Sequence, residues 1–198
     1  MKLLLASRNA GKIAELDRIV AAAELANLQV LGLRDVPEYP EAPETGATFA
    51  ENALAKARDA VAATGLAAVA DDSGLAIDAL NGMPGVLSAR WSGGHGDDEA
   101  NLRLVLGQLG DVPDERRGAA FVCAAALVVP GRPDVVVHGE WRGRIIREPR
   151  GTNGFGYDPI FVPDGEERTS AELSAQEKDA DSHRGRALRA LLPHLRAL

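Results

Sequence analysis

Two adjacent carboxylates, Asp71 and Asp72, follow a short apolar stretch and precede Ser73 and Gly74. Carboxylate oxygens suit Mg²⁺, which usually takes one or two of them together with substrate phosphate and water. Neighbouring side chains of a strand point to opposite faces, so the two acids are equivalent ligands only if the backbone turns, which Gly74 allows. The alternative is an Asx-turn, in which Asp and Ser bond the local backbone. Because both acids stand where the apolar strand stops, the pattern favours a functional site.

Residues 7–12, Ser-Arg-Asn-Ala-Gly-Lys, lie between an expected strand and an expected helix. A helix N-terminus presents unpaired N–H groups and a partial positive charge, which suit phosphate. Ser7 and Asn9 add side-chain donors, Gly11 permits close backbone approach, and Lys12 adds a full charge. The spacing is not that of a Walker A loop. The segment indicates a phosphate site, with a polar helix cap and a surface lysine as the alternative.

A third candidate lies on the helix expected to begin after Thr48. Asn52 and Lys56 are four residues apart and therefore share a helix face. A single lysine on a helix is usually solvated, and Glu44 in the preceding loop is equally weak evidence alone. Lys56 and Glu44 become stronger candidates only if this loop lies against the acid pair.

The glycine-rich segment 151–159 holds Phe155 and Tyr157, although aromatic residues make up only 4% of the chain. Glycines around an aromatic residue let its face be offered to a planar ligand, as in base-stacking sites. The alternative is a tight turn with a packed phenylalanine. The pattern leaves both interpretations open.

Basic residues gather near the last helix, where Ser182 precedes His183 and Arg184 and Lys178 lies four residues before Ser182. Cations in the first turn of a helix oppose its dipole, at a cost of roughly 0.3–1 kcal/mol. Their presence there indicates that a ligand, and not the stability of the helix, accounts for these residues. A structural histidine is the alternative.

The elements expected to carry these residues alternate along the chain. We expect strands over 2–6, 28–33, 67–70, 119–129 and 135–141, with a further strand at 144–147. Helices are expected around residues 13–23, over 48–64 and 98–109, and after Ser182. Strand–helix alternation followed by an antiparallel hairpin predicts the α/β class with a mixed sheet, in a single domain over residues 1–198.

The composition of the 198 residues excludes several classes of protein. Hydrophobic residues make up 45% and charged residues 26%, which is typical of a globular protein. Twenty-nine acidic residues against 22 basic ones give a net charge of −7, which argues against a nonspecific nucleic-acid binder. The single Cys123, expected in the core, excludes an intramolecular disulfide. No targeting segment or membrane span is visible in the sequence, so we expect a soluble, cytoplasmic protein.

Six motifs together resemble the inosine triphosphate pyrophosphatase family, which hydrolyses deaminated purine nucleoside triphosphates (ITP, dITP, XTP) to the monophosphate and pyrophosphate. They are Ser7-x-Asn9-x-x-Lys12, Glu44-Thr45-Gly46, Thr48-Phe49-x-Glu51-Asn52-Ala53-x-x-Lys56-Ala57, Ala70-Asp71-Asp72-Ser73-Gly74-Leu75, Gly154-Phe155-Gly156-Tyr157-Asp158-Pro159 and Ser182-His183-Arg184-Gly185. The resemblance runs from Lys2 into the last helix. It implies a central mixed sheet with flanking helices, an active-site cleft between two lobes, dependence on Mg²⁺ and a homodimer.

The resemblance also implies roles for individual residues. Glu44 and Asp72 would hold Mg²⁺ with Asp71 nearby, and Asp72 would be the general base. Phe155 would stack on the purine, and Lys12 and Lys56 would hold the triphosphate. The implied substrate-binding set is Ser7, Arg8, Asn9, Ala10, Gly11, Lys12, Asn52, Lys56, Ser73, Phe155, Gly156, Tyr157, Asp158, Lys178, His183 and Arg184. Ser7 stands where threonine is common and Asn153 where glycine is common, and neither departure puts the activity in doubt.

The sequence leaves open how the base is selected and which alternative functions apply. Donors from His183 or Arg184 would favour the 6-keto group of hypoxanthine or xanthine over the 6-amino group of adenine. A pyrophosphatase acting on pyrimidine or other modified nucleotides is the first alternative. A nucleotide-binding sensor without catalysis is the second, and the paired carboxylates argue against it. A nucleic-acid-binding protein is the third, and the net charge disfavours it.

Overall fold

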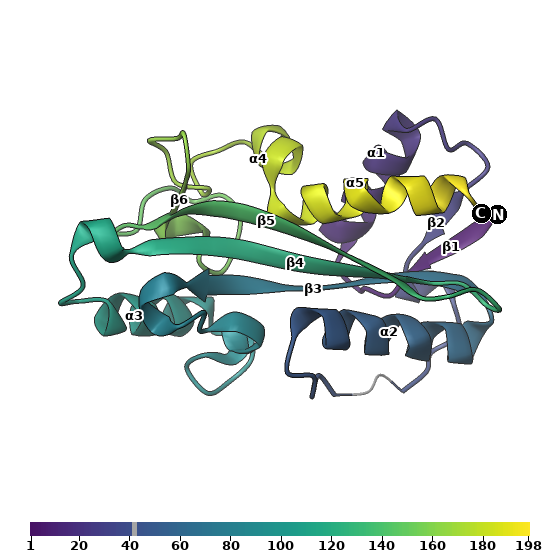
Figure 1. Ribbon diagram of the computed structural model, residues 1–198, viewed down its shortest axis with the longest axis horizontal. Coiled ribbons are helices and arrows are strands. Elements are labelled where there is room, and N and C mark those ends of the chain that lie inside the picture. The colour runs from purple at the N-terminus through teal and green to yellow at the C-terminus, as the bar shows by residue number, and fades with distance from the viewer. Residues whose placement is uncertain (41–42) are drawn as a thin grey trace. The chain divides into compact units, whose positions relative to one another are not determined.

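The computed structural model describes residues 1–40 and 43–198. Its strands form a mixed six-stranded sheet in the order β2-β1-β3-β4-β5-β6 (Figure 1). β1 pairs in parallel with β2 and β3, whereas β5 and β6 are antiparallel. The strands are β1 Lys2–Leu5, β2 Gln29–Leu31, β3 Ala67–Ile77, β4 Gly118–Val128, β5 Val135–Ile145 and β6 Phe161–Pro163. The α/β class with a mixed sheet is therefore confirmed.

Five α-helices accompany these strands in the described part of the chain. They are α1 Ala10–Ala22, α2 Phe49–Thr64, α3 Asp98–Gln108, α4 Ala175–Asp181 and α5 His183–Arg196. Local hydrogen bonds set the bounds of α2, because the Thr48 hydroxyl accepts from the Glu51 N–H and Gly65 ends the helix at a φ of +69°. Among residues 1–40 and 43–198, no helix is long and apolar enough to cross a membrane.

The chain divides into two compact units built from segments far apart in the sequence. Unit 1 comprises Met1–Asp72, Cys123–Gly139 and Arg184–Leu198, and unit 2 comprises Ser73–Val122 and Glu140–His183. β3, β4 and β5 each contribute residues to both units. The expected single domain over residues 1–198 and the expected cleft between two lobes stay predictions.

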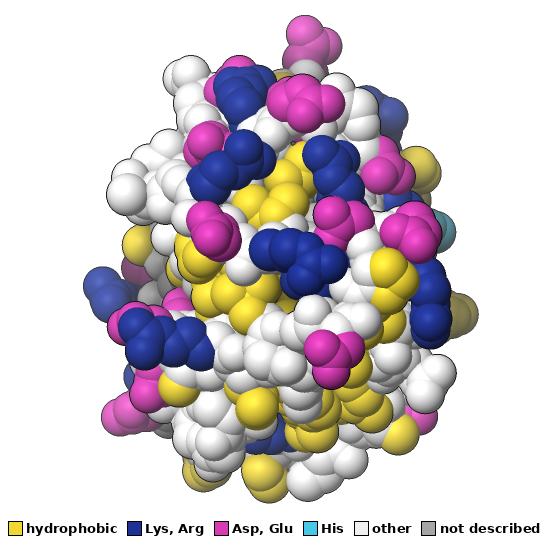
Figure 2. Space-filling view, turned by 90° about the vertical axis from the view of Figure 1, so that its left-hand side faces the viewer, with side chains coloured by type: hydrophobic (Ala, Val, Ile, Leu, Met, Phe, Trp, Pro, Cys, Tyr) yellow, Lys and Arg dark blue, Asp and Glu magenta, His cyan; other side chains and the backbone are white. Residues whose placement is uncertain are grey.

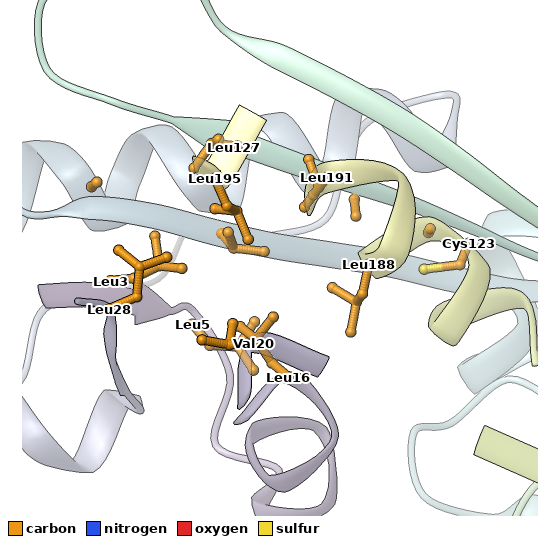
Figure 3. Close-up of a cluster of buried hydrophobic side chains, with 14 residues drawn as sticks. Leu3, Leu5, Leu16, Val20, Leu28, Cys123, Leu127, Leu188, Leu191 and Leu195 are labelled. Atoms are coloured by element: carbon orange, nitrogen blue, oxygen red, sulfur yellow. The ribbon is translucent and has the colours of Figure 1, made fainter. Parts of the chain in front are cut away.

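In unit 1, one face of the sheet packs against α1 and α5. Alternate side chains of each strand point to this face, so Leu3 and Leu5 of β1 and Leu127 of β4 share one cluster. The helices add Leu16, Val20, Leu188, Leu191 and Leu195. Figure 3 shows these leucines and Val20 pointing toward one another, with Cys123 at the edge of the group. The expected burial of Cys123 is confirmed.

The opposite face of the sheet in unit 1 packs against α2 (Figure 1). The contact is made mainly by alanines, with Ala53 and Ala57 of α2 against Ala70, Ala124 and Ala126 of the strands. Small side chains let the helix backbone approach the sheet closely, which brings the polar residues of α2 within reach of β3. The two faces of β3 thus meet different helices.

Unit 2 has its own core around the other halves of β3, β4 and β5. Leu102, Val105 and Leu109 from α3 and the residue after it pack with Leu75 and Ile77 of β3. Aromatic rings fill the rest, since the ring centroids of Phe121 and Phe161 lie 4.7 Å apart and those of Trp141 and Phe161 lie 5.6 Å apart. This core supports the glycine-rich segment 151–159.

Three expectations about strand bounds are wrong. The strand expected at 67–70 continues through the acid pair to Ile77. Of the strand expected at 144–147, only residues 144 and 145 are in a strand, as the end of β5. The strand expected over 28–33 is shorter, because Leu33–Asp35 forms a turn of 3₁₀-helix. The helix α4 was not among the expected helices.

Candidate active site

The acid pair lies within β3 and not at its end. Because Val69 is buried against α1 and α5 while Ala70 is buried against α2, alternation places Asp71 on the first face and Asp72 on the second. Gly74 makes no turn here. A Cβ on it would lie 2.4 Å from the Ser88 Oγ, so glycine is needed for close packing. The two carboxylates therefore have separate surroundings.

Asp71 binds two cations in unit 1. Lys12 Nζ of α1 lies 3.0 Å from Oδ1 and 2.8 Å from Oδ2, and Arg184 Nε of α5 donates to Oδ2 at 3.1 Å. Arg184 Nη1 also lies 3.8 Å from an oxygen of Glu15. Burial alone would raise the pKa of Asp71, but Lys12 and Arg184 outweigh it and hold that pKa well below its ordinary value.

Asp72 faces α2 and forms a second cluster in unit 1. Asn52 Nδ2 donates to Asp72 Oδ2 at 3.0 Å, and Lys56 Nζ lies 3.2 Å from Asp72 Oδ1. Lys56 also forms an ion pair with Glu44. The loop that carries Glu44 is tied to α2, because the Gly46 N–H donates to Asn52 Oδ1 at 2.7 Å. Glu44 and Asp72 thus share the Lys56 ammonium group. The loop of Glu44 therefore lies against the acid pair, which is the condition stated for Lys56 and Glu44.

Two members of this cluster, Asp72 and Lys56, have raised pKa values. Burial raises the pKa of Asp72, and its effect exceeds the lowering by Lys56 and Asn52. For Lys56, burial alone would lower the pKa, but the carboxylates of Asp72 and Glu44 outweigh it and raise that pKa. A carboxylate with a raised pKa accepts a proton more readily than an ordinary aspartate does.

The segment before α1 contains the polar helix cap that was the alternative interpretation, and phosphate binding by this segment stays a prediction. Asn9 caps the helix, with its Oδ1 accepting from the Gly11 N–H at 2.8 Å and the Lys12 N–H at 3.4 Å. The Ser7 hydroxyl accepts from the Asn9 N–H at 3.1 Å. Arg8 is exposed and lies 3.6 Å from Glu38, and Ala10 is the first residue of the helix. The capping alternative holds for Asn9, whereas Lys12 is no ordinary surface lysine.

In unit 2, the segment 151–159 offers an exposed aromatic ring. The Phe155 side chain is 61% exposed, and Lys178 Nζ of α4 lies 5.4 Å from its ring centroid. Asp158 of the same segment is buried, and its Oδ2 accepts from the Phe155 N–H at 2.9 Å and forms an ion pair with Lys178. The Ser170 hydroxyl donates to Asp158 Oδ1 at 2.8 Å. Asp158 therefore links Phe155 to Lys178.

Two further predicted residues of unit 2 are mainly core residues. Tyr157 is buried and its hydroxyl donates to the Ser88 carbonyl at 2.8 Å, and burial raises its pKa. His183 is 7% exposed and stacks on Phe121, with ring centroids 5.0 Å apart. Ser73 is a half-buried residue of β3. Substrate contacts by these three residues stay predictions.

Sequence reasoning missed three residues that the structure places at these clusters. Glu15 joins Arg184, Ser170 joins Asp158, and Asp98 accepts a hydrogen bond from the Gly156 N–H at 2.9 Å. Asp98 is recognisable in sequence only as an acid at a helix start. The helix that carries Lys178 does have a local signal, because Ser174 and Glu177 form a capping box.

A pocket of about 570 Å³ lies in unit 2 between α3 and the segment that carries Phe155. Leu102 and Leu106 line it from the helix, Pro159 lines it from the segment, and Pro149 lines it from the residues just before the segment. Figure 2 shows hydrophobic, basic and acidic side chains interspersed on one face of the molecule. A continuous basic surface, which phosphate-backbone binding requires, is absent from that face.

Comparison with known proteins identifies relatives over the whole length. The Ham1 family matches residues 3–194. The dITP/XTP pyrophosphatase of Nocardia farcinica is 70% identical over 197 residues, which cover 100% of this chain and 96% of that protein. The crystal structure of the nucleoside-triphosphatase (dITP/XTP pyrophosphatase) of Mycobacterium abscessus is 66% identical. It has a TM-score of 0.83, with 98% of this chain and 100% of that chain covered.

A solved structure with lower sequence identity is also similar over the whole length. The HAM1 protein of Coxiella burnetii is 44% identical with a TM-score of 0.89, and both chains are covered in full. The resemblance inferred from six short motifs is thereby confirmed. Because the family model matches residues 3–194 and the relatives are similar over nearly every residue, the chain belongs to the Ham1 family.

Proposed function

We propose that the chain hydrolyses deaminated purine nucleoside triphosphates, with dITP, ITP and XTP as substrates and the monophosphate and pyrophosphate as products. The relative at 70% identity is named for this activity. The observation that carries the chemistry is the cluster of Asp72, Lys56 and Glu44 in unit 1. An anhydride hydrolase needs a proton acceptor, a means of holding phosphate charge and a cation site.

The donor chemistry of this cluster fits Mg²⁺. Glu44 and Asp72 converge on one positively charged group, and both offer hard oxygen atoms. No group of three or more His, Cys, Asp or Glu side chains that could hold a metal occurs in the described part of the chain. Two carboxylates are enough for Mg²⁺ when phosphate completes the set. Bound Mg²⁺ would supply positive charge to the phosphate oxygens and so favour departure of pyrophosphate.

We assign proton transfer to Asp72. Its raised pKa suits acceptance of a proton from the attacking water, and Asn52 holds its carboxylate in place. Lys56, paired with both acids, would bind a phosphate oxygen. Each of these roles needs only side chains of unit 1.

Asp71 has a different role in this proposal. Its oxygens are held by Lys12 and Arg184, so we assign it to orienting these cations. Lys12, at the N-terminal turn of α1, would hold the triphosphate together with Ser7 and the backbone N–H groups of that turn. Metal binding by Asp71 stays a prediction.

Unit 2 would bind the base. Phe155 is exposed and has a glycine with positive φ on either side, which supports stacking on a purine. Asp158 and Lys178 lie against that segment and would surround the sugar and base. His183 of unit 2, or Arg184 of unit 1, would donate to the 6-keto oxygen. The homodimer, the cytoplasmic location and the absence of nucleic-acid binding stay predictions.

Phosphorus NMR of ITP hydrolysis with Mg²⁺ tests the proposal. We expect pyrophosphate and inosine monophosphate to appear together from the first turnover. Stepwise release of inorganic phosphate would contradict the proposed reaction. A panel with dITP, XTP, ATP and pyrimidine triphosphates then tests the substrate class, and faster hydrolysis of a pyrimidine nucleotide would favour the first alternative.

A further inference from the structure

The position of Phe155 depends on its backbone more than on packing of its ring, because the side chain is 61% exposed. Its own N–H donates to Asp158 Oδ2 at 2.9 Å, and the next N–H, of Gly156, donates to Asp98 Oδ2 at 2.9 Å. These two N–H groups lie on either side of the Phe155 Cα. Two carboxylates from different elements therefore restrain both backbone dihedrals of this residue.

The segment needs such restraint. Gly154 and Gly156 have φ values of +74° and +61°, and glycine loses more backbone entropy on ordering than other residues do. The pocket of about 570 Å³ lies between this segment and α3. Side-chain packing thus leaves space between them, and the hydrogen bond from Gly156 to Asp98 spans the two elements.

Asp98 is not needed to cap its own helix. The capping bond of α3 comes from Asp97, whose Oδ1 accepts from the Ala100 N–H at 2.9 Å. The carboxylate of Asp98 is instead directed to the Gly156 N–H. A hydrogen bond with an ionised acceptor is about twice as strong as a neutral one.

We propose that Asp98 is a positioning residue for base binding, which acts through the Gly156 N–H to hold the Phe155 ring where it stacks on the purine. The inference rests on the proposed function and extends it to α3. Asp158 restrains the same residue from the other side and is part of the glycine-rich motif. Asp98 lies 58 residues from Gly156 in sequence and outside that motif.

The test uses Asp98→Ala with Glu99→Ala as the matched control. Both substitutions remove one carboxylate from the first turn of α3, but Glu99 pairs with Arg103 on the exposed surface. We expect Asp98→Ala to raise KM for ITP by ~3- to 10-fold with kcat within about twofold. This is less than the ~10-fold or more of a full charged hydrogen bond, because Asp158 still holds the segment. Glu99→Ala should leave both constants within about twofold of the wild-type values, and Asp98→Asn, which keeps an acceptor oxygen, should recover most of the loss.

Two readouts separate positioning from a general structural effect. Amide hydrogen exchange in residues 151–159 should be faster in Asp98→Ala and unchanged in Glu99→Ala. In a double-mutant cycle, Asp98→Ala should change KM by less than about twofold when Phe155→Ala is already present. Equal KM values for the wild type and Asp98→Ala, or the same effect with and without Phe155, would overturn the inference. Absence of pyrophosphate release by the wild type would instead overturn the proposed function, and the stacking role with it.

Discussion

Replacing the two neighbouring acids of β3 by asparagine should change stability in opposite directions. Asp71 has its pKa lowered by Lys12 and Arg184 despite burial, so the folded state favours its charge. Asp72 has its pKa raised by burial, so the folded state disfavours its charge. Asp71→Asn should therefore destabilise the protein, whereas Asp72→Asn should leave stability unchanged or increase it. The two substitutions have the same size and lie next to each other.

The expected loss for Asp71→Asn follows from burial of the ion pairs. The Asp71 side chain is 2% exposed, and those of Lys12 and Arg184 are 21% and 12% exposed. Removing one partner of a buried pair costs ~3–5 kcal/mol, and the partial exposure of Lys12 places this case near ~3 kcal/mol. For a chain of this length each 1 kcal/mol shifts Tm by ~2–4 °C, which gives a decrease of ~6–12 °C.

Thermal unfolding with EDTA at about pH 7 measures both variants without a contribution from bound metal. Asp78→Asn is the control, because its ion pair with Arg142 is about half exposed on both sides and should contribute ~1 kcal/mol or less.

The pH dependence provides a second test. A lowered folded-state pKa gives stability that is present above the unfolded value of 3.8 and lost below it. The Tm difference between the wild type and Asp71→Asn should therefore persist down to about pH 4 and shrink at lower pH.

The charge of Asp72 affects the free energy of unfolding with the opposite sign, because its burial destabilises the folded state. Its folded-state pKa lies above 3.8, so the penalty is present at neutral pH and disappears as the pH falls from that raised value toward the unfolded one. A similar decrease of Tm in both variants would refute the assignment of separate surroundings. A Tm for Asp71→Asn no lower than that of Asp78→Asn would show that Lys12 and Arg184 do not stabilise the fold through Asp71.

Three other predictions concern activity. Asp72→Asn should lower kcat for ITP by ~10²-fold or more in a pyrophosphate-release assay, and near-normal turnover would remove Asp72 from the mechanism. Arg184→Ala should cut kcat/KM for ITP by ~10- to 150-fold, if its guanidinium donates to the keto oxygen, and leave the ATP rate almost unchanged; equal losses would assign Arg184 to orienting the phosphate site. Gly154→Ala should raise KM, because a Cβ would lie 2.0 Å from Asp158 Oδ2 at a φ of +74°. The control Gly165→Ala has a similar φ of +82° with no atom within 4 Å, and an equal effect on KM would exclude the Asp158 contact as the cause.

Several elements were predictable from sequence because their signals lie within a few residues of one another. The bounds of α2 depend on Thr48, Glu51 and Gly65, and its capping bond spans three residues. The family was also predictable, because six motifs kept their order along the chain. The helix α4 was predictable from Ser174 and Glu177, but its seven residues have no buried member that would give a periodic apolar pattern.

The surroundings of the acids were decided by tertiary structure alone. The tetrapeptide 71–74 is typical of a turn when only neighbours are considered, yet β3 continues through it because both faces of the strand find partners. Those of Asp71 are Lys12 and Arg184, which lie 59 and 113 residues away. The ion pair with Asp71 also gives a reason for a cation at the start of α5 that the helix dipole alone opposes. Local caps and hydrophobic periodicity indicate where most elements form. The partner of a buried charge depends instead on which helix covers each face of the sheet, and no local sequence signal contains that information.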